Sequence, residues 1–346
     1  MKRFSRIIIW MLLSIMMQCA ALLFLDKVFF KHSSDFEITE READTSVKDL
    51  SINIPSNAEN IQVSYDGKYI TYIVEDKFYL GDTKAGTVRE IITDESDKVL
   101  FAEWLPDRNR ITIAEKIVNE RGRAVINIIN YDAKSNTKYQ LKEVCKYEDG
   151  MEVDGIVTTT LSGVSYVSVS KNGNNSSIYR IDINENMEKL GVKVASLGAF
   201  KIFPHKDVVL YEDELNKHFY YYKNEKIYPI KTGTYSNLEL LAVDNNDIVY
   251  MGEVINKKVV KVIYGTLDTD ISSWGTINIE KPKESKDLYV NEKGELLIND
   301  NLEGTVTNMT TGGKVSYDGK FVSMNNKVIC SSDNEEIYIK GLNEAK

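Results

Sequence analysis

Cysteine is scarce in this sequence, and its scarcity excludes a fold held together by disulfide bridges. Three cysteines occur in 346 residues. Cys19 lies inside an apolar amino-terminal run, so only Cys145 and Cys330 could pair within a folded domain. A disulfide bridge between these two cysteines is an alternative if the domain lies in an oxidising compartment. We favour two separate buried thiols, because unpaired cysteine is commonly a core residue.

A surplus of basic residues is also missing. The chain has 43 Lys and Arg against 52 Asp and Glu, which gives a formal net charge of -9. Such a chain repels polyphosphate and offers no basic stripe that would release counterions from nucleic acid. Nucleic-acid binding is therefore not expected.

The linear motifs of catalysis and cofactor binding are absent too. The three histidines are His32, His205 and His218, and none has a serine or cysteine partner at the spacing of a nucleophilic triad. The sequence contains no G-x-S-x-G elbow, no zinc-binding pair and no phosphate-binding glycine loop. It therefore predicts no catalytic residue and no cofactor, and it favours a protein that is not an enzyme.

Two oxygen-rich segments are candidate cation sites. Residues 182–186 (DINEN) match the first half of a calcium loop, but Met187 stands where that loop requires glycine and Lys193 where it requires a bidentate glutamate. Residues 244–247 (DNND) also gather side-chain oxygens. Both patterns are typical of polar turns between strands, so no metal ligand is predicted.

A long uncharged run is the first positive feature. Residues 7–25 read IIIWMLLSIMMQCAALLFL, which is 19 residues without a charge. A helix of that length covers about 30 Å, the thickness of a hydrocarbon core. Basic residues lie in segment 1–6 and acidic residues follow the run, so the positive-inside rule leaves residues 1–6 in the cytoplasm. We expect a single-pass protein of the cytoplasmic membrane whose carboxy-terminal domain is extracytoplasmic.

Two other interpretations of this run stay open. A cleaved signal peptide has a shorter apolar region that ends at small residues, whereas the small residues 19–21 lie inside this run. Lipid attachment at Cys19 fits poorly, because Gln18 precedes it where a small residue is needed. Residues 26–48 are rich in acidic side chains and poor in large apolar ones, which predicts a solvated stalk.

The most informative pattern is a near-duplicate. Residues 62–70 read QVSYDGKYI and residues 314–322 read KVSYDGKFV. Their starting positions, 62 and 314, lie 252 residues apart, which is six intervals of 42. A period of roughly 40–45 residues is typical of four-stranded propeller blades. The spacing therefore indicates an array of repeats.

Weaker copies of the same unit fill the interval. Each has an apolar strand, a turn rich in Pro, Asp, Asn or Gly, and a second strand of β-branched or aromatic residues. In the first copy, the turn at Asp66 and Gly67 precedes strands expected at residues 69–74, 77–82 and 87–92. Beyond the amino-terminal run, no sustained helical periodicity occurs. The weaker copies are residues 102–115, 155–173, 200–212, 240–251 and 288–298.

Closure of the ring can be predicted as well. The last unit, residues 314–341, supplies about three strands, while residues 49–55 form an unassigned strand before the first unit. Pairing that early strand with the final blade would remove two exposed edges. We expect an all-β domain over residues 49–346, a propeller of six or seven blades with seven preferred, preceded by the single transmembrane helix.

The segments SYDGKYITY and SYDGKFVSM resemble the TolB-type and dipeptidyl-peptidase-type propeller repeats, whose pattern is close to SPDGKxIAF. The following segment, residues 78–91, is similar to the next part of that pattern, whereas Tyr65 and Tyr317 replace its usual proline. The resemblance implies a propeller fold and often a periplasmic or surface role. It does not imply catalysis, since such repeats serve as interaction platforms or cover a separate hydrolase domain.

Aromatic residues offer one further candidate surface. Residues 217–231 (KHFYYYKNEKIYPIK) interleave aromatic side chains with lysines, and we interpret them as an edge or third strand with one packed face. Trp104 and Trp274 are expected in the packing between blades.

The function expected from the sequence is a non-enzymatic binding or scaffold module for a protein, peptide or cell-wall ligand. Two alternatives stay open: a propeller-type hydrolase or lactonase with a site in the central channel, and a sensor or assembly subunit of a membrane complex. The sequence predicts neither the oligomeric state nor the ligand.

Overall fold

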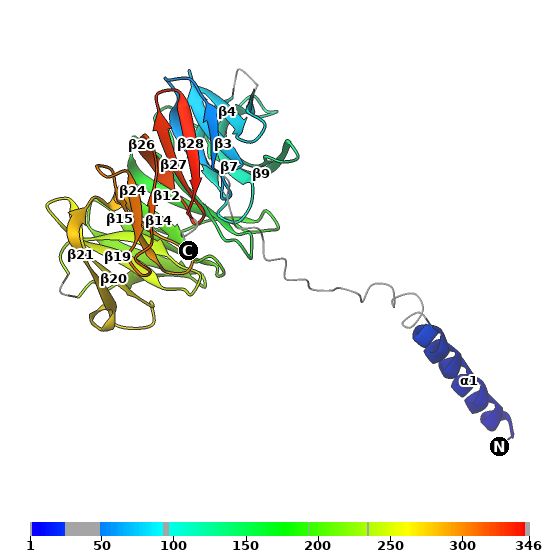
Figure 1. Cartoon of the computed structure of the whole chain (residues 1–346). Coiled ribbons are helices and arrows are strands. Elements are labelled where there is room, and N and C mark those ends of the chain that lie inside the picture. The colour runs from blue at the N-terminus through cyan, green and yellow to red at the C-terminus, as the bar shows by residue number, and fades with distance from the viewer. Residues whose placement is uncertain (1, 25–48, 93–96, 193, 234, 343–346) are drawn as a thin grey trace. The chain divides into compact units, whose positions relative to one another are not determined.

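The computed structural model describes residues 2–24, 49–92, 97–192, 194–233 and 235–342. It divides into two compact units, Met1–Thr45 and Ser46–Lys346. The first unit contains helix α1 (Lys2–Phe24), and the second contains the strands shown in Figure 1 together with the short 3-10 helices η3 (Ile271–Ser273) and η4 (Ser285–Asp287). The predicted stalk, residues 26–48, lies outside the described residues.

Within the described residues, the strands form seven four-stranded antiparallel sheets, called blades 1 to 7 below. Blade 1 comprises β2 (Glu59–Val63), β3 (Tyr69–Val74), β4 (Lys77–Asp82) and β5 (Thr87–Glu90). Blade 2 comprises β6 (Lys98–Trp104), β7 (Arg110–Val118), β8 (Ala124–Asp132) and β9 (Thr137–Lys146). Blade 3 comprises β10 (Met151–Thr158), β11 (Ser165–Lys171), β12 (Asn174–Ile181) and β13 (Met187–Lys189). Blade 4 comprises β14 (Leu197–Ile202), β15 (Val208–Asp213), β16 (His218–Lys223) and β17 (Lys226–Ile230). Blade 5 comprises β18 (Leu238–Val243), β19 (Val249–Ile255), β20 (Lys258–Gly265) and β21 (Gly275–Lys283). Blade 6 comprises β22 (Leu288–Val290), β23 (Leu296–Asp300), β24 (Thr305–Asn308) and β25 (Lys314–Ser316). Blade 7 comprises β26 (Lys320–Met324), β27 (Val328–Asp333) and β28 (Glu336–Gly341) together with β1 (Leu50–Asn53).

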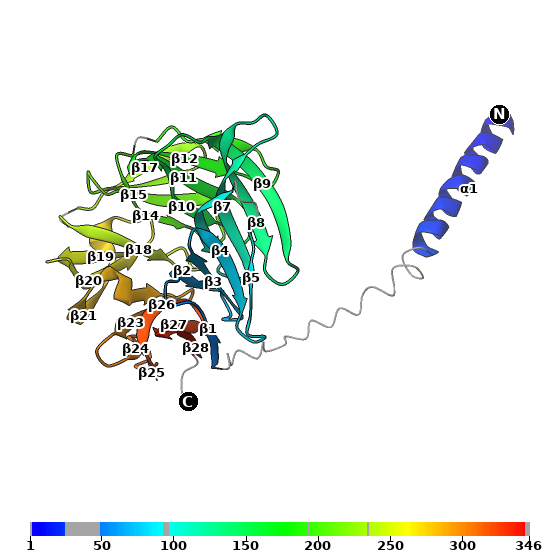
Figure 2. The ribbon, with the colours of Figure 1, turned by 90° about the horizontal axis from the view of Figure 1, so that it is seen from above.

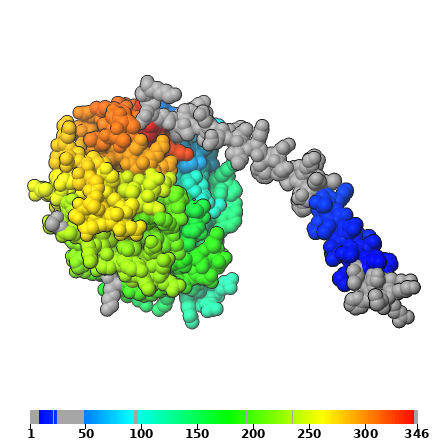
Figure 3. Space-filling model, turned by 90° about the horizontal axis from the view of Figure 1, so that it is seen from below, coloured from blue at the N-terminus to red at the C-terminus, as the bar shows by residue number. Residues whose placement is uncertain are grey.

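The seven blades form a closed ring. The first strand of each blade contacts the first strand of a neighbour, as in the pairs β2 and β6, β10 and β14, and β18 and β22. These first strands therefore lie innermost, and the blades follow one another around the ring in chain order (Figure 2). Figure 3 shows the same succession on one face, from cyan through green and yellow to orange. The prediction of an all-β propeller with seven blades is confirmed.

Apolar packing between neighbouring blades forms the core. One cluster joins blades 1 and 2 through side chains such as Leu80 and Trp104, and another joins blades 4 and 5 through Leu210 and Trp274. Corresponding clusters join the other neighbouring blades. The prediction that both tryptophans pack between blades is confirmed. A single sheet cannot bury both of its faces, so each blade depends on the next.

Strand β1 closes the ring. Its residues pair antiparallel with β28, in the register Leu50 to Ile339 through Asn53 to Glu336. Ile52 is buried in the cluster that joins blades 7 and 1. The amino-terminal strand of the domain thus completes the blade that the carboxy-terminal strands begin, as predicted from the sequence.

The near-duplicate segments occupy different places in their blades, so the prediction of an evenly spaced repeat is wrong. The first SYDG lies in the turn between β2 and β3, from the first to the second strand of blade 1. The second begins in β25, the last strand of blade 6, and leads into β26 of blade 7. The motif encodes a chain reversal, and both Gly67 and Gly319 have positive φ. The same turn sequence can join strands within a blade or strands of two neighbouring blades. Two identical turn sequences therefore do not show that the segments occupy the same position in their blades.

The weaker copies, in contrast, align as predicted. Residues 102–115, 155–173, 200–212, 240–251 and 288–298 each cover the first two strands of a blade or part of them. Blade 6 is a complete but short blade, because its strands contain three to five residues. The first strands begin at Glu59, Lys98, Met151, Leu197, Leu238, Leu288 and Lys320, so the repeat is uneven.

The turn in blade 1 joins this blade to the next. Asp66 is buried and accepts hydrogen bonds from Lys68 Nζ at 2.7 Å and from Asn109 Nδ2 of blade 2 at 3.2 Å. Burial opposes ionisation of this carboxyl, but the hydrogen bonds from Lys68 and Asn109 outweigh burial and lower the pKa of Asp66.

Replacing Asp66 by asparagine is expected to lower the free energy of unfolding by about 1–3 kcal/mol at pH 7. Because the pKa of Asp66 is lower in the folded chain, its contribution is present above the ordinary value of 3.8 and is lost as the pH falls through the folded value. The difference in free energy of unfolding between the natural chain and Asp66→Asn, measured by urea unfolding, should therefore be smaller at pH 3 than at pH 7. An equal loss at both pH values, or an equal loss in the exposed control Asp149→Asn, would contradict this role.

The cysteines and the amino-terminal helix complete the comparison with the sequence. Cys145 and Cys330 are both free thiols, which confirms that they are separate, but only Cys330 is buried as expected, since Cys145 is half-buried. The predicted membrane-spanning helix over residues 7–25 is not confirmed: among the described residues, no helix meets the length and hydropathy that a bilayer crossing requires.

Candidate active site

A central pocket of about 860 Å³ lies at the inner strands of blades 2 to 6. Its walls come from β6, β10, β14, β18 and β22, and its rim comes from the loops that follow these strands and from the loop after β26. Rim residues include Asp107, His205, Asn245, Glu292 and Asn326. Pockets of this size commonly hold small molecules or cofactors.

Irregular strand pairing shapes the wall. The pairing of β6 with β7 shifts between Val99 and Phe101, and the pairing of β14 with β15 shifts between Leu197 and Phe200. Similar shifts occur in β10 and β18. A bulge of this kind re-aims the side chains that follow it. In β6 and β14, the residues after the shift include Glu103 and Lys201, which both line the pocket.

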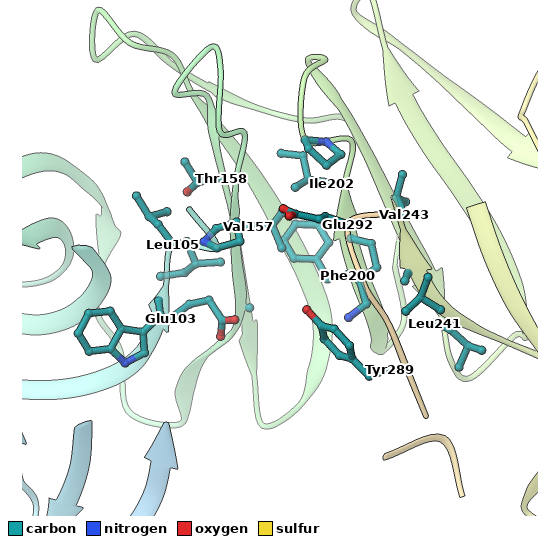
Figure 4. A pocket seen from close by; sticks show the side chains of 18 of the residues that line it. Glu103, Leu105, Val157, Thr158, Phe200, Ile202, Leu241, Val243, Tyr289 and Glu292 are labelled. Atoms are coloured by element: carbon teal, nitrogen blue, oxygen red, sulfur yellow. The ribbon is translucent and has the colours of Figure 1, made fainter. Parts of the chain in front are cut away.

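Glu103 is the acidic group of the inner wall. Figure 4 shows its carboxylate extending into the pocket from β6. Within the described residues, it forms no ion pair within 4 Å and no side-chain hydrogen bond. Water in the pocket reaches the carboxyl, but protein surrounds it closely enough that desolvation raises its pKa to about 7, against a smaller opposing effect of Lys201. A carboxyl with this pKa can both accept and donate a proton near neutral pH.

Lys201 is the matching cation, and it comes from blade 4. Desolvation lowers the pKa of its ammonium group, and the charge of Glu103 partly opposes this effect. Lys201 also has no ion pair within 4 Å among the described residues. The two charges therefore interact without direct contact, which leaves each able to meet a ligand.

Tyr289 enters the pocket from the opposite wall. Its ring lies on β22, and Figure 4 shows its hydroxyl directed toward the side of the pocket that carries Glu103. The hydroxyl donates to Asn326 Oδ1 of blade 7 at 3.1 Å, and the Glu292 backbone N–H donates to the same oxygen at 2.9 Å. Burial raises the pKa of Tyr289, so the phenol stays neutral.

The oxygen-rich segments form turns, in agreement with the sequence analysis. Asp182 accepts hydrogen bonds from the backbone N–H groups of Asn184 and Asn186, and Asp244 accepts from those of Asn246 and Ile248. Each carboxylate therefore stabilises its own turn. Among the described residues, no group of three or more His, Cys, Asp or Glu side chains is arranged to hold a metal ion.

The histidines and the aromatic segment lie apart from Glu103. His205 is on the pocket rim, and His218 contacts the ring of Tyr220 edge-on. His32 lies outside the described residues. Residues 217–231 contain β16 and β17, where Phe219 is buried and Tyr228 is partly exposed. The predicted strand with one packed face is therefore β16, the third strand of blade 4, whereas the edge strand β17 is exposed along most of its length.

Sequence reasoning missed Glu103 and Lys201. The available signal was a charged residue within an apolar inner strand, in FAEW (residues 101–104) and in FKIF (residues 200–203). A charge rarely occupies such a position without a function or a partner. The signal becomes specific only when the inner strands of different blades are known to share one pocket.

Comparisons with known proteins support the fold. No family profile and no curated protein matches this chain. Among solved structures, it is similar to an oligogalacturonate lyase from Vibrio parahaemolyticus, with a TM-score of 0.55 and 11% identity over 86% of this chain and 92% of the other. A luciferin-regenerating enzyme matches with a TM-score of 0.43 and 11% identity, over 86% of this chain and 96% of the other. Together with the structure, the likeness defines the chain as a seven-bladed β-propeller.

These comparisons correct one expectation and leave another unconfirmed. The expectation of a non-enzymatic protein is contradicted by the likeness to the oligogalacturonate lyase, a solved propeller enzyme of similar fold. The absence of linear motifs does not exclude an enzyme, since a propeller can assemble a site from single residues on separate blades. The TolB-type or dipeptidyl-peptidase-type relationship is not confirmed.

Proposed function

We propose that the protein is a propeller-type hydrolase that uses Glu103 as its acid–base group in the central pocket. The observation that carries this proposal is geometric: Glu103 and Lys201 line one pocket from blades 2 and 4, and neither has an ion pair within 4 Å among the described residues. Desolvation there raises the pKa of the Glu103 carboxyl and lowers that of the Lys201 ammonium group. Strongly perturbed pKa values in a concave site are typical of catalytic groups. The oligogalacturonate lyase of similar fold supports an enzymatic function, while the hydrolytic reaction is inferred from Glu103 and Lys201.

The roles of the three side chains follow from their chemistry. Ionised Glu103 takes a proton from water, and the water oxygen forms a bond to the carbonyl carbon of an ester or lactone. Lys201 stabilises the negative charge that develops on the carbonyl oxygen. As the carbon–oxygen bond to the alcohol breaks, Glu103 returns the proton to the leaving oxygen. Tyr289, held by Asn326, positions the substrate through its hydroxyl.

A panel of substrates tests the proposal. The purified full-length chain would be incubated with p-nitrophenyl esters, γ- and δ-lactones, and oligogalacturonate, with product release followed by absorbance and by acid release. Hydrolysis of an ester or lactone that Glu103→Gln abolishes supports the proposal. Cleavage of oligogalacturonate alone, or turnover that Glu103→Gln leaves unchanged, overturns it.

The cellular placement is a separate proposal that rests on the sequence. We propose that residues 7–25 anchor the chain in the cytoplasmic membrane, with residues 1–6 inside and the propeller, residues 49–346, outside. Carbonate extraction should leave the protein in the membrane pellet, and protease added to spheroplasts should digest the propeller. Recovery of the intact protein in the soluble fraction would contradict the anchor. A protein, peptide or cell-wall partner stays a prediction.

A further inference from the structure

The central pocket combines apolar and polar side chains. Six partly or fully buried apolar side chains from blades 2 to 5 line it, and Figure 4 labels all of them: Leu105, Val157, Phe200, Ile202, Leu241 and Val243. The same blades contribute Glu103 and Lys201, and blades 6 and 7 add Tyr289, Asn291, Glu292 and Asn326. A ligand with a polar head and a hydrocarbon part can therefore meet both kinds of lining, because hydrocarbon gives no hydrogen-bond partner to polar groups.

The charges that line the pocket accommodate a single anionic group. Lys201 lacks an ion pair, whereas the other lining lysine, Lys286, is 2.7 Å from Glu284. Among the lining acids, Asp107 is paired with Arg108, and Asp154 accepts hydrogen bonds from three serines, Ser168, Ser170 and Ser176. A ligand with several carboxylates would meet only one unpaired ammonium group and would also approach Glu292.

We propose that the central pocket binds an amphiphilic acyl compound, with its carboxyl or carbonyl group between Glu103 and Lys201 and its aliphatic chain against the apolar side chains of blades 2 to 5. This inference rests on the proposed function and names its substrate class: an ester or lactone of a medium-length aliphatic acid. Hydrolysis of such a substrate releases the corresponding carboxylate at Lys201. Glu103, which is protonated in part near neutral pH, can donate a hydrogen bond to that carboxylate.

Direct binding of the product tests this inference without any need for turnover. Isothermal titration of the full-length chain with hexanoate, octanoate and decanoate should show affinity that rises about fourfold for each added methylene. Galacturonate, which has one carboxylate but a polar ring, should bind at least tenfold more weakly than octanoate. Affinity that is independent of chain length, or that favours galacturonate, overturns the inference.

Variants separate the polar and apolar contributions. Lys201→Met should weaken octanoate binding at least tenfold, whereas the control Lys206→Met, which removes a lysine that is paired with Asp247 and does not line the pocket, should change it less than threefold. Leu241→Asn should reduce the gain per methylene. Unchanged binding in Lys201→Met overturns the inference.

Glu103→Gln distinguishes this inference from the proposed function. Glutamine retains a hydrogen-bond donor, so the variant should still bind octanoate while it loses hydrolysis. Octanoate binding without turnover of any ester by the natural chain would contradict the hydrolase and support the ligand class. Hydrolysis that prefers short polar acyl groups would support the hydrolase and contradict the ligand class.

Discussion

Replacing Glu103 by glutamine is expected to lower kcat/KM by a factor of about 10²–10⁴, the usual contribution of general acid–base catalysis. The amide keeps the size of the side chain and its place on β6, but it cannot accept a proton. The kinetic constants of the purified variant on its best ester or lactone would measure the effect. The expected result is a fall in kcat with little change in KM, because the lost interaction is made mainly in the transition state.

The pH dependence of kcat/KM provides the second part of this test. The profile of the natural chain should rise with an apparent pKa of about 7, since Glu103 must be ionised to act as a base. In Lys201→Met, the rise should move to higher pH, because Lys201 is the one charge that opposes the raised pKa of Glu103. The exposed control Glu120→Gln should leave the profile unchanged. A profile without a rise near neutral pH, or activity in Glu103→Gln within twofold of the natural chain, would reject the catalytic role.

Replacing Ile52 by alanine is expected to lower the free energy of unfolding by about 2–5 kcal/mol, the range observed for buried aliphatic truncations. Ile52 is 5% exposed and packs in the cluster that contains Ile70, Ile337 and Ile339. It is the buried side chain of β1, the strand that completes blade 7. Truncation therefore leaves a cavity at the closure of the ring, where the two ends of the domain meet.

Urea unfolding of the full-length chain would measure this effect through the midpoint and slope of the transition. Ser51→Ala serves as a matched control, since Ser51 is the exposed neighbour in the same strand. Its expected change is within about 0.5 kcal/mol. A loss in Ile52→Ala as small as that of the control would show that β1 contributes little to closure.

Much of the fold could be predicted because strand signals are local. The strands at residues 69–74 and 77–82 have the predicted bounds, since β-branched and aromatic residues follow a turn at Asp66 and Gly67. The closing strand could be predicted because a free strand at one end of the chain and an incomplete blade at the other both leave edges exposed. The even period of 42 residues could not hold, because the turn motif at residues 314–322 joins two blades.

The sequence by itself determined that this protein is a ring of β-sheet blades, because strand and turn preferences act between residues close in the chain. It also determined that neighbouring blades stabilise each other, since a single blade cannot bury the apolar side chains on both of its faces. Only the tertiary structure decided where the candidate site lies. Glu103 and Lys201 come from blades 2 and 4, and they share a pocket only because ring closure brings the inner strands around one axis. Their altered pKa values follow from that enclosure, which depends on surrounding atoms from distant segments of the chain.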